Sequence, residues 1–365
     1  MKKRVVLGMS GGVDSSVAAC LLMEEGLEVL GVSMELYSCD SPLKKGCCTP
    51  IDRLDARKIC EQFKIPFEIL DLRKPFKTHV MEYFASEYSK GRTPLPCAPC
   101  NRDVRFKALL EYADKVGAYG IATGHYARIQ KNEDGTFSLL RGIDPKKDQS
   151  YFLWGLGQTE LSRLKLPIGN FSKPQVREMA RKWNLITSEK KESQELCFVG
   201  DDDHARFLEE HFPEAAFQAG DYVDEAGKRL GKHRGLHAYT IGQRRGLGVA
   251  LGERRYVVSL NPEKNEVVLG SKDSLKASGL IAKDVHWIAP PPSILTLEGG
   301  GIKGEGDPVV RIRSTHPGVE ATLNNSEEGL KVEFKNPQEA VTPGQAAVFY
   351  QNDVCLGGGW IERAF

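Results

Sequence analysis

The segment Ser10–Ser16, with the sequence Ser-Gly-Gly-Val-Asp-Ser-Ser, has the composition of an anion-binding loop. It follows the strand-like run Arg4–Met9 and precedes the helix-like run Val17–Leu22. Glycines carry no Cβ, so backbone N–H groups and a helix N-terminus can approach an anion there. Serine hydroxyls add hydrogen bonds, and the Asp14 carboxylate is a candidate Mg²⁺ ligand. A simple turn is the alternative, but the flanking serines and aspartate favour a nucleotide site.

This loop lacks the Gly-Lys-Ser/Thr signature of an ordinary P-loop, which excludes the common cradle for a transferring γ-phosphate. It resembles the pyrophosphatase loop of enzymes that split ATP into AMP and pyrophosphate in order to adenylate a substrate. The loop therefore predicts ATP, together with Mg²⁺, as the ligand.

A pair of cysteines forms the second candidate site, within Pro94–Asn101, Pro-Leu-Pro-Cys-Ala-Pro-Cys-Asn. We expect Asn101 to cap a helix over 102–116, which would place Cys100 just outside the helix N-terminus. The partial positive charge there favours a thiolate and hence a nucleophile. A zinc knuckle would need a second, well-spaced pair, and a thioredoxin-like motif a different strand–helix setting. A reactive thiol is the better interpretation.

Cys197 lies in a polar loop that also contains Lys190 and Lys191. Nearby cations would favour its thiolate, whereas its apolar neighbours Leu196 and Phe198 are equally typical of a buried, inert cysteine. The thiols that we expect to pack in the core are Cys20, Cys60 and Cys355.

Composition places the chain among ordinary globular proteins, with 365 residues, 41% of them hydrophobic, and room for two or three domains. No apolar run reaches transmembrane length, and the first one is too short for a signal peptide. Nine cysteines without an export signal predict a reducing, cytoplasmic location rather than a disulfide framework. The net charge of +1 is uninformative, but the basic run Lys228–Arg255 suits either a phosphate backbone or a solvated face.

Alternation of strands and helices in the first half predicts a parallel, doubly wound sheet with its ligand at the carboxyl ends of the strands. Gly124–Tyr126 would then open on the same edge as Ser10–Ser15. The expected elements are strands over 5–8, 28–36, 66–70 and 119–124, and helices over 13–24, 51–63, 76–88, 102–116 and 174–183, the last capped by Ser172. After about residue 205, short alternating runs between Gly, Pro and Asn turns predict small β-barrels.

Together, these motifs resemble the bacterial tRNA 2-thiouridylases, which sulfurate the wobble uridine of certain tRNAs. The shared motifs occur in the same order over nearly the whole chain. They are Gly8–Ser16, Thr93–Asn101, Ala122–Tyr126, Lys147–Leu153, Cys197–Phe198, Thr240–Gly248 and Thr342–Gln345.

The resemblance implies an α/β pyrophosphatase-loop domain of the adenine nucleotide alpha hydrolase type over 1–205. A small central β domain over 206–275 and a C-terminal β-barrel over 276–365 would follow. The implied reaction adenylates the C2 oxygen of the wobble uridine and then replaces it with persulfide sulfur, releasing AMP and pyrophosphate. A sulfur donor, such as a cysteine desulfurase or a sulfur relay protein, would be a second partner beside tRNA.

The resemblance also assigns roles to individual residues. Cys197 would carry the persulfide and Cys100 would be its partner thiol. The ATP-binding residues would be Gly8, Met9, Ser10, Gly11, Gly12, Val13, Asp14 and Ser15, with Met34 and Gly124 near the adenosine. The residues facing the target base would be Leu95, Pro96 and Cys97, and those touching tRNA elsewhere would be His125, Lys147, Asp148, Gln149, Arg313, Ser314 and Gln345.

Three features depart from the family pattern. Cys97 stands where many members have aspartate, and Ser314 stands where a tyrosine is expected. The segment before Cys197 reads Ser-Gln-Glu-Leu instead of the commoner Ser-x-Gly-Ile. With Cys100 and Cys197, Cys97 would supply three thiolates to an iron–sulfur cluster with one open iron. The alternative is that Cys97 is a spare or resolving thiol.

Two other functional classes stay open on the sequence. A pyrophosphatase-loop ligase acting on a small molecule would need neither Cys100 nor Cys197. A non-catalytic RNA-binding protein of the same fold would bind tRNA without releasing pyrophosphate from ATP. In the thiolation hypothesis, the loop Thr187–Cys197 would fold on tRNA binding, because Cys197 must reach both ATP and a flipped base.

Overall fold

The computed structural model describes residues 3–37, 50–191, 196–199, 203–215, 217–249, 254–288 and 307–365. Cys47 and Cys48, an adjacent pair that is poorly spaced to complete a zinc site with Cys97 and Cys100, lie outside these ranges. The chain forms two compact units. The first comprises Met1–Val80, Cys97–Asp202 and Asp353–Leu356, and the second Met81–Pro96, Asp203–Asn352 and Gly357–Phe365.

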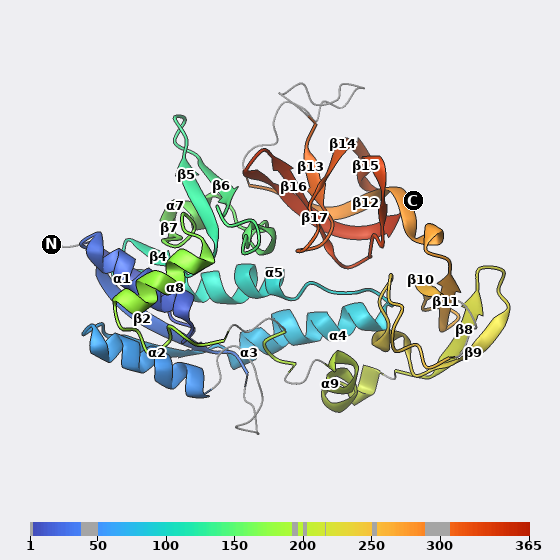
Figure 1. Ribbon diagram of the computed structural model, residues 1–365, viewed down its shortest axis with the longest axis horizontal. Helices are drawn as coiled ribbons and strands as arrows, with labels where there is room; N and C mark the ends of the chain where they lie inside the picture. The colour runs from blue at the N-terminus through green and yellow to red at the C-terminus, as the bar shows by residue number, and fades with distance from the viewer. Residues whose placement is uncertain are drawn as a thin grey trace. The chain divides into compact units, whose positions relative to one another are not determined.

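A five-stranded parallel sheet forms the centre of the first unit, in the order β3-β2-β1-β4-β7 (Figure 1). The strands are β1 (Arg4–Gly8), β2 (Glu28–Glu35), β3 (Phe67–Asp71), β4 (Gly120–Ala122) and β7 (Leu164–Lys165). Strand order therefore reverses between β1 and β4, where Val5 pairs with both Val29 and Gly120. A ligand crevice is expected at such a reversal. The predicted parallel sheet is confirmed.

Helices cover both faces of this sheet. The main ones are α1 (Val13–Glu24), α2 (Pro50–Gln62), α6 (Lys107–Lys115) and α8 (Lys173–Lys182). Val17, Ile59 and Val176, from α1, α2 and α8, share one buried core with Val5 and Leu7 of β1. Helix α6 packs against β1 and β4. Side chains alternate between the two faces of a strand, so the side chain of Val6 points to the opposite face of the sheet from those of Val5 and Leu7.

The cysteine pair lies within a helical run, and not before it as predicted. The run consists of α5 (Cys97–Pro99), the π-helix η2 (Cys100–Phe106) and α6. Pro99 is tolerated in the first turn because the N–H groups there have no helical acceptor. Asn101 does not cap the helix; its amide donates to Phe152 O at 3.2 Å. The prediction that Cys100 lies just outside a helix N-terminus was therefore wrong, because Cys100 is the fourth residue of the helical run.

Smaller elements complete the first unit. They are α3 (Arg73–Phe76), η1 (Lys77–Met81, which runs into the second unit), β5 (Ala127–Lys131), β6 (Phe137–Arg141), η3 (Ser150–Phe152) and α7 (Gln158–Arg163). The β5–β6 hairpin was not predicted from the sequence. Val354 and Cys355, at the start of β17, pair with Leu140 and Leu139 of this hairpin.

The second unit contains two β structures. The central sheet has the order β10-β11-β8-β9 and a core around Tyr222, Val257 and Val267. Its strands are β8 (Gly220–Asp224), β9 (Arg229–His233), β10 (Tyr256–Asn261) and β11 (Glu266–Gly270). Helices α4 (Glu82–Ser89) and α9 (His204–His211) and the short turns η4 (Pro213–Ala215), η5 (Leu236–Ala238) and η6 (Asp273–Leu275) belong to the same unit.

The C-terminal strands close into a barrel in the order β12-β15-β14-β13-β16-β17, because β12 pairs with both β15 and β17. They are β12 (Lys276–Trp287), β13 (Val309–Arg311), β14 (Val319–Ser326), β15 (Gly329–Glu339), β16 (Ala346–Gln351) and β17 (Val354–Ala364). The predicted central β domain and C-terminal barrel are confirmed. The boundaries after residues 205 and 275 stay predictions.

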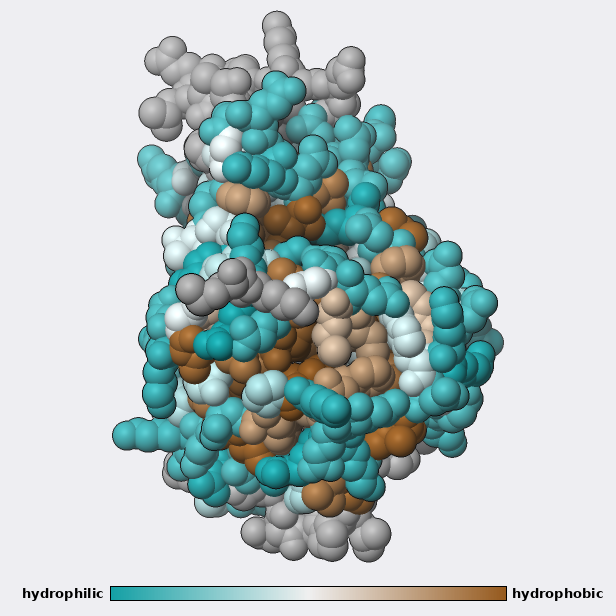
Figure 2. Space-filling model, turned by 90° about the vertical axis from the view of Figure 1, so that its left-hand side faces the viewer, coloured by the Kyte–Doolittle hydropathy of each residue, from teal (hydrophilic) through white to brown (hydrophobic). Residues whose placement is uncertain are grey.

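The surface is mixed in polarity. Figure 2 shows a face on which hydrophilic side chains surround a central group of hydrophobic ones. Among the described residues, no helix is both long enough and apolar enough to cross a membrane.

The close approach of α2 to the loop after β1 leaves no room for a side chain at Gly11, which can be tested. Its φ is +73°, and a Cβ there would lie 2.0 Å from Asp52 O. Replacing Gly11 with alanine should lower the free energy of unfolding by at least about 1–2 kcal/mol, the cost of a left-handed conformation alone. Urea unfolding measures it. Gly12→Ala is the control, because a Cβ at Gly12 would meet only Ser10 Oγ at 3.4 Å. Equal losses in both variants would show that neither the left-handed backbone nor the contact with α2 makes Gly11 special.

Candidate active site

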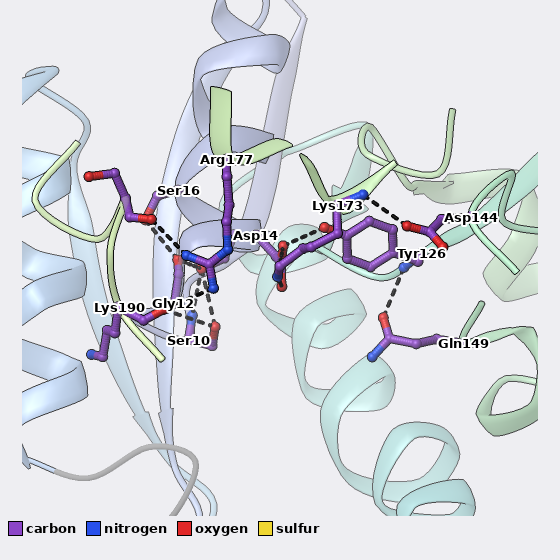
Figure 3. Close-up of polar contacts among 12 residues, drawn as sticks. Ser10, Gly12, Asp14, Ser16, Tyr126, Asp144, Gln149, Lys173, Arg177 and Lys190 are labelled. Carbon is purple, nitrogen blue, oxygen red and sulfur yellow. Dashed lines mark hydrogen bonds and ion pairs between the residues drawn. The ribbon is translucent and has the colours of Figure 1, made fainter. Parts of the chain in front are cut away.

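The loop between β1 and α1 folds on its own serines. Ser16 Oγ donates to Gly12 O at 2.9 Å, and Ser15 Oγ lies 3.2 Å from both Ser10 N and Ser10 Oγ. Gly12 is the N-cap of α1, so the first turn of that helix faces the loop. Helix N-termini carry partial positive charge and N–H groups without helical acceptors, which favour an anion. The serine hydroxyls at 15 and 16 thus shape the loop, as Figure 3 shows for the Ser16 bond.

Glycine allows the turn after β4 to press against this loop. A Cβ on Gly124 would lie 2.8 Å from both Asp14 C and Ser15 N. A Cβ on Gly8 would lie 3.6 Å from Met34 Cε, so these two residues are also neighbours. The structure therefore brings the predicted residues Gly8–Ser15, Met34 and Gly124 together at one edge of the sheet.

Asp14 is the charged centre of the site (Figure 3). Its carboxylate accepts hydrogen bonds from Lys173 Nζ at 2.8 and 2.9 Å and from the Tyr126 hydroxyl at 2.7 Å. Lys173 is only 7% exposed and its ammonium also lies over the Tyr126 ring. The predicted Mg²⁺ ligand therefore has a fixed cation beside it. A single carboxylate suits Mg²⁺, which takes most of its ligands from water and phosphate.

Three residues predicted to touch tRNA lie in one segment that holds Tyr126, the hydrogen-bond partner of Asp14. Gln149 Oε1 accepts from Tyr126 N at 2.9 Å, and Gln149 N donates to Tyr126 O at 2.8 Å. Asp148 Oδ1 accepts from the backbone N–H groups of Gly142 and Ser150, both at 3.1 Å, and Lys147 N donates to Asp144 O. The segment that holds all three predicted residues therefore fixes the tyrosine that binds Asp14.

A second lysine reaches the same loop from the polar segment after α8. Lys190 Nζ donates to Gly11 O at 2.9 Å and pairs with Asp52 at 2.7 Å and Asp55 at 2.6 Å. Burial alone would lower the pKa of Lys190, but the hydrogen bonds to both carboxylates outweigh it and hold that pKa above its usual value. From the sequence, Lys190 is one of two cations that would favour a Cys197 thiolate, with a buried, inert cysteine as the alternative. In the structure, Lys190 pairs with two carboxylates beside the loop between β1 and α1. Arg177 secures the segment by donating to Lys190 O at 3.2 Å.

His125 follows Gly124 and its Nδ1 lies 2.8 Å from Thr123 Oγ1. Burial, together with the positive charge of Arg105, lowers the pKa of His125 to about 3. The ring is therefore neutral near pH 7. It can donate or accept a hydrogen bond there but cannot attract a phosphate as a cation.

The three thiols of the proposed chemistry differ in exposure. Cys97 is exposed, Cys100 is 6% exposed and Cys197 is half-buried. Phe198 anchors the chain beside Cys197 by an edge-to-face contact with Phe76, with ring centroids 5.6 Å apart. The six cysteines in the described ranges form no disulfide.

The remaining described thiols, Cys20, Cys60 and Cys355, are buried, as predicted. Burial raises the pKa of Cys20 and of Cys60 to about 12, which keeps both protonated and unreactive.

The iron–sulfur hypothesis needs Cys97, Cys100 and Cys197 to converge. Within the described part of the chain, no group of three or more Cys, His, Asp or Glu side chains is arranged to hold a metal ion. The thiols present do not fit a preformed cluster site. The cluster stays a hypothesis from the sequence.

The other predicted residues lie in the second unit. Gln345 Nε2 donates to Thr93 O and Pro94 O, both at 3.1 Å, just before Leu95 and Pro96. Arg313 is exposed, its guanidinium lies 3.4 Å from Glu339 O, and Ser314 O accepts from the buried Arg311.

Sequence reasoning missed Lys173 and the partners of Lys190, and it placed Tyr126 at this edge without predicting its hydrogen bond to Asp14. Tyr126 had a signal, because it follows a strand whose end was predicted to face the loop. Lys173 had a weaker one, as the first residue of a helix capped by Ser172. No local pattern joins Lys190 to Asp52, 138 residues away.

Known protein families match all three parts of the chain. Residues 3–201 match the tRNA methyl transferase HUP domain family, 205–271 the tRNA methyl transferase PRC-barrel domain and 277–361 the aminomethyltransferase beta-barrel domain. The chain is similar to the tRNA-specific 2-thiouridylase MnmA of Heliobacterium modesticaldum, with 44% identity over 100% of this chain and 93% of that protein. It is 46% identical to the protein of the same name from Geobacter metallireducens, over 100% and 98%.

A solved 4-thiouridine synthetase–RNA complex with bound ATP is 18% identical and covers 58% of this chain and 51% of that chain, with a TM-score of 0.35, too weak a likeness to indicate function. The full-length relatives decide the family: the chain belongs to the tRNA-specific 2-thiouridylases.

Proposed function

We propose that this protein uses ATP to replace the C2 oxygen of the wobble uridine of tRNA with sulfur. The observation that carries the proposal is the full-length identity to proteins named tRNA-specific 2-thiouridylase. The site supports it, because a glycine-rich loop at a strand reversal suits a nucleotide, and the cysteines assigned to sulfur transfer lie in the same unit. The reaction would take place in the cytoplasm. The boundaries between the three domains would fall after residues 205 and 275.

ATP would bind with its phosphates on the N–H groups around Gly11–Val13 and its adenosine near Met34 and Gly124. Asp14 would hold a Mg²⁺ ion, which neutralises phosphate charge when bound. Lys173 would then turn from Asp14, which it now contacts at 2.8 and 2.9 Å, toward the phosphates. Tyr126, fixed by Gln149, would keep Asp14 oriented during this exchange.

Sulfur transfer follows from the poor leaving ability of a uracil carbonyl oxygen. The C2 oxygen attacks the α-phosphorus of ATP, pyrophosphate leaves, and C2 then carries AMP as a leaving group. The terminal sulfur of a Cys197 persulfide, loaded by a cysteine desulfurase or a sulfur relay protein, attacks C2 and expels AMP. The Cys100 thiolate next attacks Cys197 Sγ, which forms a Cys100–Cys197 disulfide and leaves the sulfur on the base. A thiol reductant must then reduce the disulfide.

On the RNA side, Leu95, Pro96 and Cys97 would face the flipped base. His125, Arg313 and Ser314 would contact the tRNA, His125 as a neutral hydrogen-bonding group. The basic run Lys228–Arg255 would follow the phosphate backbone. Mass analysis of the wobble nucleoside after incubation with tRNA, ATP and a sulfur source tests the whole proposal. A nucleoside that keeps its oxygen would overturn it.

Removing Cys197 should separate the two half-reactions. We expect Cys197→Ser and Cys100→Ser to lose thiouridine formation while still releasing pyrophosphate from ATP in the presence of tRNA. Nucleoside mass analysis and a pyrophosphate assay measure the two steps. Cys355→Ala, which removes a buried thiol in β17, is the control and should keep both activities. Thiouridine formed by Cys197→Ser would refute the persulfide assignment.

Lys173 gives a second test. Lys173→Met should lower kcat/KM for ATP about 100-fold, because one fixed cation is lost where charge develops. The control is Lys165→Met, which removes a half-exposed lysine paired with Glu25 in the same unit. An unchanged kcat/KM in Lys173→Met would show that Lys173 only stabilises the fold.

The thiol chemistry proposed here needs no iron. Protein purified anaerobically should be colourless and active after persulfide loading, with no iron bound in proportion to its activity. Iron and sulfide analysis measures this, with Cys97→Asp as the matched variant because aspartate is the residue common in the family. Activity that rises with iron content and disappears in Cys97→Asp would restore the cluster hypothesis.

A further inference from the structure

The loop Thr342–Gln345, between β15 and β16, is hydrogen-bonded to Thr93 and Pro94, in the segment that follows α4. Gln345 Nε2 donates to Thr93 O and to Pro94 O, both at 3.1 Å. A side-chain amide nitrogen carries two hydrogens, so these two bonds use its full donor capacity. Both acceptors are backbone carbonyls of consecutive residues, 252 and 251 positions away in sequence.

Further hydrogen bonds hold the same stretch. Thr93 N donates to Pro343 O at 2.9 Å. The Arg92 guanidinium binds Glu362 Oε2 at 2.6 Å and Ile361 O at 3.0 Å. Ile361 N in turn donates to Gln345 O at 2.8 Å. Backbone and side chains therefore tie Arg92–Pro94 to the loop and to β17 within one compact unit.

Gly344 makes this close approach feasible. Its φ is +90°, and a Cβ there would lie 2.8 Å from Thr93 O. Glycine alone combines that backbone conformation with that spacing. The loop is thus shaped for the Thr93 carbonyl rather than merely adjacent to it.

The prolines of this stretch explain why Gln345 binds it through carbonyl oxygens. Pro94 and Pro96 have no N–H group, so this stretch has fewer backbone donors than usual, and Thr93 N is already bound to Pro343 O. Its carbonyls must then receive hydrogen bonds from elsewhere. Gln345 supplies them immediately before Leu95 and Pro96, both of which are buried.

We propose that Gln345 is a positioning residue, which holds Thr93 and Pro94 so that Leu95 and Pro96 meet the target base in one fixed orientation. This inference rests on the function proposed above. It differs from the tRNA contact that the family resemblance implies for Gln345, because both amide hydrogens already bind within the protein, which leaves Oε1 as the acceptor through which a tRNA contact would have to be made. A positioning role predicts loss of turnover without loss of tRNA affinity.

The test uses Gln345→Glu in the full-length protein. The new carboxylate is isosteric but cannot donate, and it faces two carbonyl oxygens. We expect hydrogen exchange at Thr93 and Leu95 to accelerate, since each is an N–H-bearing residue within the held stretch. Single-turnover thiolation should slow about 10- to 100-fold, the range expected for a misplacement near 1 Å. The Kd for tRNA should stay within about twofold of the Kd of Gln351→Glu.

Gln351→Glu is the matched control, because it adds the same charge at the end of β16, six positions further along the chain. Gln345→Met, which adds no charge, serves as the second variant if Gln345→Glu is unstable. A raised Kd for tRNA with unchanged exchange would overturn the proposal in favour of direct contact. Wild-type protein that exchanges slowly at Thr93 but never forms thiouridine would refute the proposed function and leave the hydrogen bonds of Gln345 to Thr93 and Pro94 supported.

Discussion

The close approach of two backbone segments underlies the whole nucleotide site. The loop after β1 and the turn after β4 nearly touch, since a Cβ on Gly124 would fall 2.8 Å from Asp14 C. The strand order reverses between β1 and β4, and a crevice is expected at such a reversal. Glycine at 11 lets α2 approach this loop, and glycine at 124 lets the turn after β4 do so. Asp52 of α2 and Lys173 of α8 lie beside the loop.

Both lysines at the rim are already paired with carboxylates before a nucleotide arrives. Asp14 is neutralised by Lys173, and Lys190 by Asp52 and Asp55. Exposed ion pairs contribute about 0–1 kcal/mol, whereas breaking a buried one is far more costly. Lys173 is almost fully buried, which makes its pair with Asp14 costly to break without a replacement partner. Under the proposed function, nucleotide binding would therefore exchange the ionic partners of Asp14 and Lys173.

Local signals explain what the sequence could predict. The Ser10–Ser16 motif and the strand–helix alternation specify the loop, the parallel sheet and its reversal, because they depend on glycine, periodicity and short connections. The start of the cysteine helix could not be found in this way. Asn101 is a good cap by propensity, but its amide instead reaches Phe152 in another element. Lys190 likewise pairs with distant carboxylates rather than the nearby thiol, and only the tertiary fold reveals such pairings.

The different exposures of the thiols bear on how sulfur is conserved in the proposed reaction. If the Cys100 thiolate attacked a Cys197 persulfide before the base was activated, it would form the disulfide and release hydrosulfide into solution. Cys100 is 6% exposed, while Phe198 fixes the chain next to Cys197 against Phe76. Cys100, the proposed resolving thiol, is thus buried, whereas Cys197, the proposed persulfide carrier, is half-buried. The greater exposure of Cys197 suits a thiol that a sulfur donor must reach. In the proposed reaction, we expect Cys100 to attack only after a tRNA with a flipped uridine has bound.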